Sequence, residues 1–272
     1  MDLGLTGRKA LVAGGGRGIG KAIAMELARE GADVVIVSRT QHELERTARE
    51  ISDVTGRLVI PQVLDVTNTE QVNWGVKQAA AALGGLQILV NSAALPGGSP
   101  EAIGPIETVD EEILKWDFDV KYVGALRLAR AAIPFLKTAG WGRIINISGG
   151  NARAAGNLSG GARNVSMVHF TKTLSIQLGR YGITVNCIHP GATRTERTPV
   201  MLAERGAELG IDAAEVERRD FAPGSPAANA IGRMVDAQEV GYVAAYLASD
   251  KAWAVTGEVL AAGGGVGNSV YY

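Results

Sequence analysis

A glycine-rich turn is the first feature of the sequence with a clear chemical use. Gly14, Gly18 and Gly20 follow a short apolar run and open an amphipathic one. Without Cβ atoms the turn can be tight, its N–H groups can approach a pyrophosphate, and the helix N-terminus adds partial positive charge. An ordinary strand-to-helix turn would also use glycine. In this context we predict that Gly14, Arg17, Gly18, Ile19 and Gly20 bind a dinucleotide.

Two arginines indicate which dinucleotide to expect. In proteins that prefer NAD, an acidic residue at the end of the second strand accepts a hydrogen bond from the ribose 2′-OH. Here that position is Ser38, followed by Arg39, and Arg17 lies within the glycine turn. Two guanidinium groups can converge on a 2′-phosphate with no carboxylate to repel it. We therefore predict NADP(H), bound through Ser38 and Arg39; the alternative is that both arginines are solvated surface charges.

Short apolar runs alternate with longer amphipathic stretches, and this alternation predicts the fold. The amphipathic stretches have helical spacing, as in Ile19, Ile23 and Leu27. The pattern indicates an α/β, doubly wound Rossmann fold with a seven-stranded parallel sheet and helices on both faces. Pro61 lies in the third run, and because proline cannot donate to a central ladder, that strand belongs at an edge. The predicted strands are 9–13, 33–38, 58–64, 86–91, 143–148, 183–188 and 258–262.

Length and composition are those of one globular domain over residues 1–272. The chain is 46% hydrophobic and 20% charged, with a formal net charge of −1, so we expect neither nucleic acid nor membrane as a partner. Cys187 is the only cysteine, which excludes an intramolecular disulfide and a thiolate metal cluster, and we predict no metal site. The N-terminus lacks a signal-peptide layout, and we expect a cytoplasmic protein.

Residues from 195 to about 232 interrupt the alternation of strands and helices. This stretch contains many charges and Pro199, Pro223 and Pro226, but no apolar strand. Long connections inside a domain are usually functional. We predict an inserted lid that covers a small-molecule substrate; the alternative is a disordered surface excursion.

Six segments together resemble motifs of the short-chain dehydrogenase/reductase family. They are VAGGGRGIG at 12–20, LDV at 64–66, VNSAA at 90–94, GRIINIS at 142–148, GITVNCIHPGATRT at 182–195 and TGEVLAAGGG at 256–265. The match covers nearly the whole chain. The resemblance implies that Asp65 accepts from the adenine amine, that Asn91 lies beside the adenosine ribose, and that Thr195 contacts the nicotinamide amide or the diphosphate. Val66, Pro190 and Gly191 belong to the same implied cofactor site.

The family's catalytic pattern fails in this chain. Relatives use a Tyr-x-x-x-Lys pair on one helix, a serine after the fifth strand and an asparagine on the fourth helix. Aligned on the motifs, these positions are Gly160, Asn164, Gly149 and Lys121. Ser148 lies one residue before Gly149, and strand alternation points its hydroxyl to the other face. No tyrosine has a lysine four or seven residues later, so we predict an atypical active site that lacks the tetrad.

Several polar residues remain near the expected nicotinamide. They are Lys121, Asn146, Ser148, Asn151, Ser159, Arg163, Asn164 and His189. We take Lys121, Ser148 and Asn164 as the catalytic candidates. A desolvated Lys121 would have a lowered pKa suited to acid–base chemistry; alternatively, it fills the space of the missing tyrosine and pairs locally. His189 either acts at neutral pH or packs at a strand end with its ring away from the cleft.

The sequence thus predicts an NADP(H)-dependent oxidoreductase that acts on a small carbonyl or alcohol by a non-standard proton-transfer route. The alternatives are an inactive NADP(H)-binding sensor or partner protein and, less favoured, a non-redox lyase or isomerase. The resemblance also implies a homo-oligomer, a tetramer, because the family's fourth and fifth helices pair across two-fold axes. Val120, Val123, Leu126 and Leu128 supply apolar content there, and the tail 269–272 would reach a neighbouring subunit.

Overall fold

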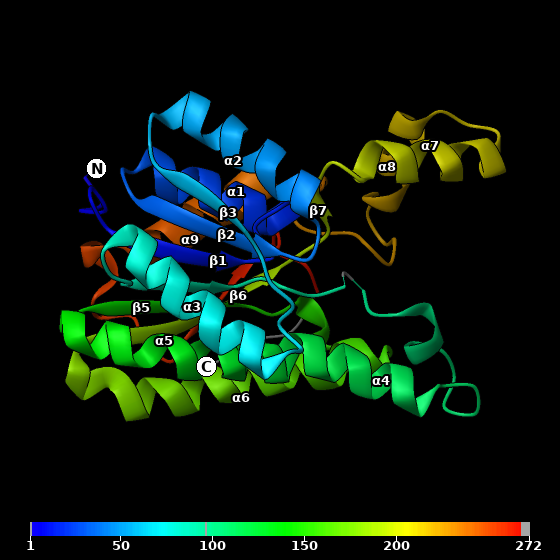
Figure 1. The fold of residues 1–272 in the computed structure, drawn as a ribbon. Helices are drawn as coiled ribbons and strands as arrows, with labels where there is room; N and C mark the ends of the chain where they lie inside the picture. Colours follow the sequence, from blue (N-terminus) through cyan, green and yellow to red (C-terminus); the bar gives the residue numbers. More distant parts are fainter. Residues whose placement is uncertain (1, 96, 268–272) are drawn as a thin grey trace.

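A parallel seven-stranded sheet forms the centre of the computed structural model, which describes residues 2–95 and 97–267 (Figure 1). In spatial order the strands are β3 (Val59–Val63), β2 (Asp33–Ser38), β1 (Lys9–Ala13), β4 (Ile88–Asn91), β5 (Gly142–Ile147), β6 (Ile183–Pro190) and β9 (Val259–Ala262). All neighbouring strands pair in parallel. Each predicted strand is present, and the doubly wound Rossmann fold is confirmed.

Helices cover both faces of the sheet, as Figure 1 shows. One face packs against α1 (Gly18–Arg29), α2 (Gln41–Thr55) and α9 (Ala237–Ala248), and the other against α3 (Thr69–Leu83), α5 (Gly124–Ala139) and α6 (Leu158–Leu178). Helix α4 (Glu111–Phe118) continues into α5 through a π-helical turn, η2 (Asp119–Val123). Short 3₁₀ segments lie at Pro100–Ala102, Gly150–Arg153, Gly179–Tyr181 and Asp250–Ala252.

Alternate side chains of the inner strands enter two separate cores. In β1, Val12 packs into the core with α1, α2 and α9, whereas its neighbour Leu11 packs into the core with α3, α5 and α6. Both side chains are fully buried, as a parallel sheet covered on two faces requires. The edge strand β3 is different: Val63 is 50% exposed, and Pro61 pairs in register with Ile36 on one side only. The predicted edge position is confirmed.

The segment predicted as a lid is largely helical. It contains α7 (Thr198–Leu209) and α8 (Ala213–Asp220), and β7 (Thr193–Arg194) pairs with β8 (Val235–Asp236) at its base. The two helices share a small apolar cluster of their own, formed by Leu202, Val216, Phe221 and Met234. In Figure 1 they stand apart from the helices that cover the sheet.

Two further expectations concern a membrane and a neighbouring subunit. Within residues 2–95 and 97–267, no helix combines the length and the apolar character needed to cross a membrane. The tail 269–272, which we expected to reach a neighbouring subunit, lies outside the described residues.

Candidate active site

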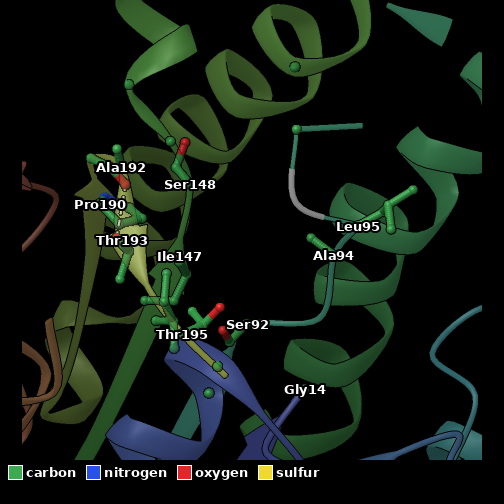
Figure 2. A pocket seen from close by; sticks show the side chains of 18 of the residues that line it. Gly14, Ser92, Ala94, Leu95, Ile147, Ser148, Pro190, Ala192, Thr193 and Thr195 are labelled. Atoms are coloured by element: carbon green, nitrogen blue, oxygen red, sulfur yellow. Dashed lines mark hydrogen bonds between the residues drawn. The ribbon is translucent and has the colours of Figure 1, made fainter. Parts of the chain in front are cut away.

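A cleft of about 1690 Å³ lies along the carboxyl ends of the strands, where open α/β sheets bind their ligands. It runs from the turn after β1, past the ends of β4 and β5, to the end of β6 and the base of the α7–α8 segment. Figure 2 shows this wall, with Gly14 in the lower part, Ser92 above it, and Ser148 and Pro190 towards the upper left. One drug-sized ligand usually fills about 300–1,000 Å³, so the cleft has room for a larger ligand or for two.

Close backbone approach explains the glycines of the first turn. Gly14 has a φ of +76°, and a Cβ there would lie 2.8 Å from the Ser92 carbonyl oxygen. A Cβ on Gly20 would lie 2.1 Å from the Gly14 carbonyl oxygen. Only glycine lets the turn and α1 come this close together. The turn therefore presents backbone, rather than side chains, to the cleft.

A carboxylate lies at the N-terminus of α1. Glu196 Oε2 accepts a hydrogen bond from Gly18 N at 2.9 Å, and Lys21 Nζ lies 3.6 Å from Glu196 Oε1. Burial favours the neutral acid, but hydrogen bonds from backbone N–H groups and the charge of Lys21 hold the pKa of Glu196 below its ordinary value. The helix N-terminus thus holds an anion, which is the property that a pyrophosphate needs. The sequence analysis missed Glu196, although it directly follows Thr195.

Three exposed arginines line the cleft near the end of β2. Arg17 and Arg39 were predicted there. Arg46, in the second turn of α2, also lines this part of the cleft. The Arg39 guanidinium lies 5.7 Å from the ring centre of Trp116, which also lines the cleft. The expectation that no carboxylate would be present is wrong, because Glu43 lines the same end and accepts from Arg17 Nη1 at 3.4 Å. Helical periodicity from Arg39 onward was the signal that could have found Glu43 and Arg46.

The other predicted cofactor residues divide into those that line the cleft and one that does not. Lining residues are Gly14, Arg17, Gly18, Ile19, Gly20, Ser38, Arg39, Asp65, Val66, Pro190, Gly191 and Thr195. Asn91 is instead 5% exposed and donates from its side-chain amide to Asn146 Oδ1 at 2.8 Å. It therefore links β4 to β5 within the sheet.

Lys121 is buried in the π-helical turn between α4 and α5. Its side chain lines the cleft, the residue is 7% exposed, and Nζ donates to the Ser148 carbonyl oxygen at 3.0 Å. Burial and, secondly, the positive charge of Arg163 lower the pKa of Lys121 to about 7, with the thiol of Cys187 opposing this slightly. A lysine with this pKa exchanges its proton at neutral pH, as acid–base catalysis needs. Such π-helical turns are frequent at functional sites.

Asparagine amides fill the space beside the two glycines that we aligned with catalytic residues. A Cβ on Gly149 would lie 2.7 Å from Asn164 Nδ2, and one on Gly160 would lie 2.8 Å from Asn151 Nδ2. The Ser148 hydroxyl donates to the Asn164 backbone oxygen at 2.9 Å and so points at α6. The three predicted catalytic residues are thus brought together through backbone carbonyl groups.

The imidazole of His189 forms part of the cleft wall. The residue is 3% exposed, and neither ring nitrogen has a hydrogen-bond partner among the described residues. Burial and, to a smaller extent, the charges of Arg153 and Lys121 lower the pKa of His189 to about 4. The ring is therefore neutral at physiological pH, where it can accept or donate a hydrogen bond but carries no charge.

Comparison with known proteins identifies the family. A family model described as enoyl-(acyl carrier protein) reductase matches residues 13–267. The chain belongs to the short-chain dehydrogenase/reductase family. Its relatives include a 3-alpha-(or 20-beta)-hydroxysteroid dehydrogenase of Mycobacterium bovis, 34% identical over 96% of this chain and 90% of that protein. An NADPH-dependent reductase of Bacillus subtilis is 29% identical over 97% of this chain and 99% of that protein.

Solved structures of short-chain dehydrogenases/reductases share the fold over nearly the whole chain. L-sorbose reductase from Gluconobacter frateurii, solved with NADPH and L-sorbose, superposes with a TM-score of 0.91 at 28% identity, covering 99% of this chain and 100% of that one. Levodione reductase gives a TM-score of 0.84 at 26% identity, covering 95% and 97%. The predicted family of NAD(P)-dependent oxidoreductases is confirmed. Over residues 2–95 and 97–267, no three His, Cys, Asp or Glu side chains gather as a metal site would require.

Proposed function

We propose that the protein is an NADP(H)-dependent oxidoreductase that acts on a small carbonyl or alcohol, with Lys121 as the proton donor and acceptor. The observation that carries the proposal is the buried Lys121, whose pKa of about 7 suits proton transfer at neutral pH. It lines the same cleft as the glycine-rich turn. Two of the relatives support a reductase, since one is named NADPH-dependent and the other was solved with NADPH.

The arginines at the end of β2 support NADP(H) over NAD(H). Ser38 stands where an acidic residue would select the ribose 2′-OH of NAD, and Arg17, Arg39 and Arg46 line the cleft around it. Guanidinium groups form strong charge-assisted hydrogen bonds to phosphate. Glu43 pairs with Arg17, so we assign the main contact with a 2′-phosphate to Arg39.

We propose that the four catalytic positions of the family are Lys121, Gly149, Gly160 and Asn164 here, and that proton transfer is rebuilt around the lysine. When bound, the cofactor supplies or accepts the hydride. In reduction, Lys121 gives a proton to the substrate oxygen, and in oxidation it takes that proton back. Ser148 holds the lysine through its carbonyl oxygen. Asn164 Oδ1, a buried acceptor with no partner in the described chain, is left to orient a substrate hydroxyl.

The segment 195–232 is proposed as the lid over this site. Side chains from both of its ends line the cleft, among them Arg197, Met201, Pro226 and Asn229. Its helices pack mainly on their own small cluster, so they can move relative to the sheet without exposing the main cores.

A second candidate is an NADP(H)-binding protein without turnover. One observation favours it: Lys121 Nζ is already engaged by the Ser148 carbonyl oxygen and is buried. A lysine used in this way fills space and links η2 to the residue after β5 without taking part in a reaction.

An absorbance assay separates the two candidates. NADPH is mixed with ketones, aldehydes, sugars and enones, and NADP⁺ with alcohols, while calorimetry measures cofactor binding. We expect slow turnover of at least one compound, and Lys121→Met should lower kcat by about 10²–10⁴-fold without changing the Kd of NADPH. Lys77→Met, at an exposed position of α3, is the matched control. Cofactor binding without any turnover would favour the second candidate, and unchanged turnover in Lys121→Met would exclude the lysine as the acid.

We also propose that the protein is a homo-oligomer, with a tetramer as the expected state. On α6, Val165 and Ile176 are 50% and 74% exposed, and a subunit interface would cover these apolar side chains. Of the residues first suggested for the interface, Leu128 is buried in the protein's own core. Light scattering at micromolar concentration tests the proposal, and a stable monomer would refute it.

A further inference from the structure

Two of the described arginines are buried, and they differ in how their charge is satisfied. Arg143 is 0% exposed, and all three of its side-chain nitrogens donate to carbonyl oxygens, those of Ser249 and Gly142. It also lies 3.5 Å from Asp250 Oδ1 and 4.0 Å from the ring centre of Trp141. This arginine has the full set of partners expected of a buried guanidinium.

Arg163, on α6, is also buried, with 3% of its surface exposed, but it lacks a full set of hydrogen-bond partners. Nη2 donates to the Leu95 carbonyl oxygen at 2.9 Å, but Nε and Nη1 have no hydrogen-bond partner among the described residues. Burial lowers the pKa of Arg163, which reflects the unfavourable placement of a charge away from water. Unlike Arg143, Arg163 is one of the residues that line the cleft.

The carboxylate of Asp117 acts on Arg163 but does not pair with it. Asp117 is 1% exposed, and its oxygens accept from Ser99 N at 2.9 Å, Ser99 Oγ at 2.8 Å and Ser159 Oγ at 2.5 Å. Its charge opposes the effect of burial on the pKa of Arg163, yet none of the ion pairs within the described chain joins the two side chains. Because Ser99 and Ser159 occupy the oxygens of Asp117, two N–H groups of the guanidinium are left without a hydrogen-bond partner among the described residues.

The surrounding part of the cleft adds further positive charge. Lys121 and Arg153 also line it, and the charges of both act on His189. Three residues of the lining carry a carboxylate. Glu43 and Asp65 lie at the opposite end, after β2 and β3, and Glu196 is held at the N-terminus of α1. The substrate end is therefore basic, and a buried cation with free donors forms part of its wall.

We propose that the substrate carries an anionic group, a carboxylate or a phosphate ester, which binds Arg163 while its carbonyl or alcohol lies beside Lys121. This inference rests on the proposed function and names its substrate class. Guanidinium groups bind carboxylate and phosphate through charge-assisted hydrogen bonds, which are stronger than neutral ones. An anion there would also offset the charge of Arg163 that lowers the pKa of Lys121, and so favour the protonated lysine that reduction consumes.

Matched pairs of ligands test the proposal by binding alone. Protein saturated with NADP⁺ is titrated in a calorimeter with pyruvate, acetoacetate and 4-oxopentanoate, each against its methyl ester, and with dihydroxyacetone phosphate against dihydroxyacetone. We expect at least one anion to bind about tenfold more tightly than its neutral partner. Tighter binding of an acid than of its methyl ester indicates a carboxylate as the anionic group. Tighter binding of dihydroxyacetone phosphate than of dihydroxyacetone indicates a phosphate ester. If no anion binds more tightly than its neutral partner, the proposal is wrong.

Variants of Arg163 test whether this residue causes the tighter binding of anions. Arg163→Gln should abolish it, Arg163→Lys should keep part of it, and Arg130→Gln, at an exposed position of α5, should leave it unchanged. If Arg163→Gln no longer binds NADP⁺ and is therefore unfolded, Arg163→Lys decides the question, because an undiminished preference in that variant would contradict the proposal. Turnover is scored separately. Anions that bind but are never reduced would refute the oxidoreductase, whereas neutral carbonyls reduced as efficiently as anions would refute only the substrate class.

Discussion

The two ends of the cleft are built from different parts of the chain. At the proposed cofactor end the glycine turn and the N-terminus of α1 present backbone, and the turn depends on the absence of side chains at Gly14 and Gly20. At the substrate end the wall is made of buried polar side chains, Lys121, Arg163 and His189, that have few partners. Backbone geometry is fixed by the fold, whereas side chains can be exchanged one at a time without moving a strand. The cofactor end can therefore stay typical of the family while the substrate end changes its chemistry.

The largest expected effect tests the backbone character of the cofactor end. Gly20→Ala places a Cβ 2.1 Å from the Gly14 carbonyl oxygen, so the turn must shift, and we expect NADPH binding to weaken by about 100-fold or more. Gly179→Ala, outside the cleft, is the control, because its Cβ would meet nothing within 4 Å. Calorimetry measures both. Equal Kd values in the two variants would show that the close approach has no role in cofactor binding.

A smaller effect should come from the side chain that we assign to the 2′-phosphate. Arg39→Ala removes about one charge-assisted hydrogen bond, so NADPH binding should weaken by about tenfold while NADH binding stays the same. Arg49→Ala, exposed on α2 and outside the cleft, is the control. A wild type that binds NADH and NADPH equally would contradict the assignment of Ser38 and Arg39.

The smallest effect concerns stability at the substrate end. The pKa of Lys121 lies at about 7 in the folded protein, below its ordinary 10.5, so the unfolded chain holds more protons between these values. Wild-type stability therefore rises with pH across this window, and below pH 7 the full penalty of the buried charge is present. Lys121→Met should raise Tm by about 5 °C at pH 6, with a gain that shrinks towards pH 10. Calorimetric scans across pH check this, with Lys77→Met as the control, and a gain independent of pH would contradict the lowered pKa.

Much of the fold could be predicted from the sequence because its signals are local. Alternation of apolar and amphipathic runs located every strand of the seven-stranded sheet, and Pro61 placed β3 at its edge, whereas the short strands β7 and β8 were not predicted. The glycine-rich turn was equally local, since Gly14 precedes α1 closely and Gly18 and Gly20 lie in its first turn. The helices of the segment 195–232 were missed, because their apolar residues serve a small separate cluster and the prolines and charges obscured the periodicity.

The substrate end was harder to predict because its properties depend on contacts between distant segments. The position of Lys121 was found by alignment, but its bond to the Ser148 carbonyl oxygen joins η2 to the end of β5. The unpartnered Nε and Nη1 of Arg163 depend on two serines that occupy the oxygens of Asp117. Asn91 was assigned to the cleft by resemblance, and its contact with Asn146 across two strands is not encoded in its neighbours.

The carboxylate of Glu196 accepts from the N-terminus of α1, so in the proposed cofactor site it would compete with the pyrophosphate for the same N–H group. Because Glu196 is attached to the chain immediately before α7, it acts at a high effective concentration that does not change when the protein is diluted. A dinucleotide bound at the same N–H group must displace this carboxylate and thereby release the entrance of the α7–α8 segment. Part of the free energy of cofactor binding would then be needed to displace Glu196, so the measured affinity would be lower than the intrinsic one. Cofactor binding and release of the segment would be coupled.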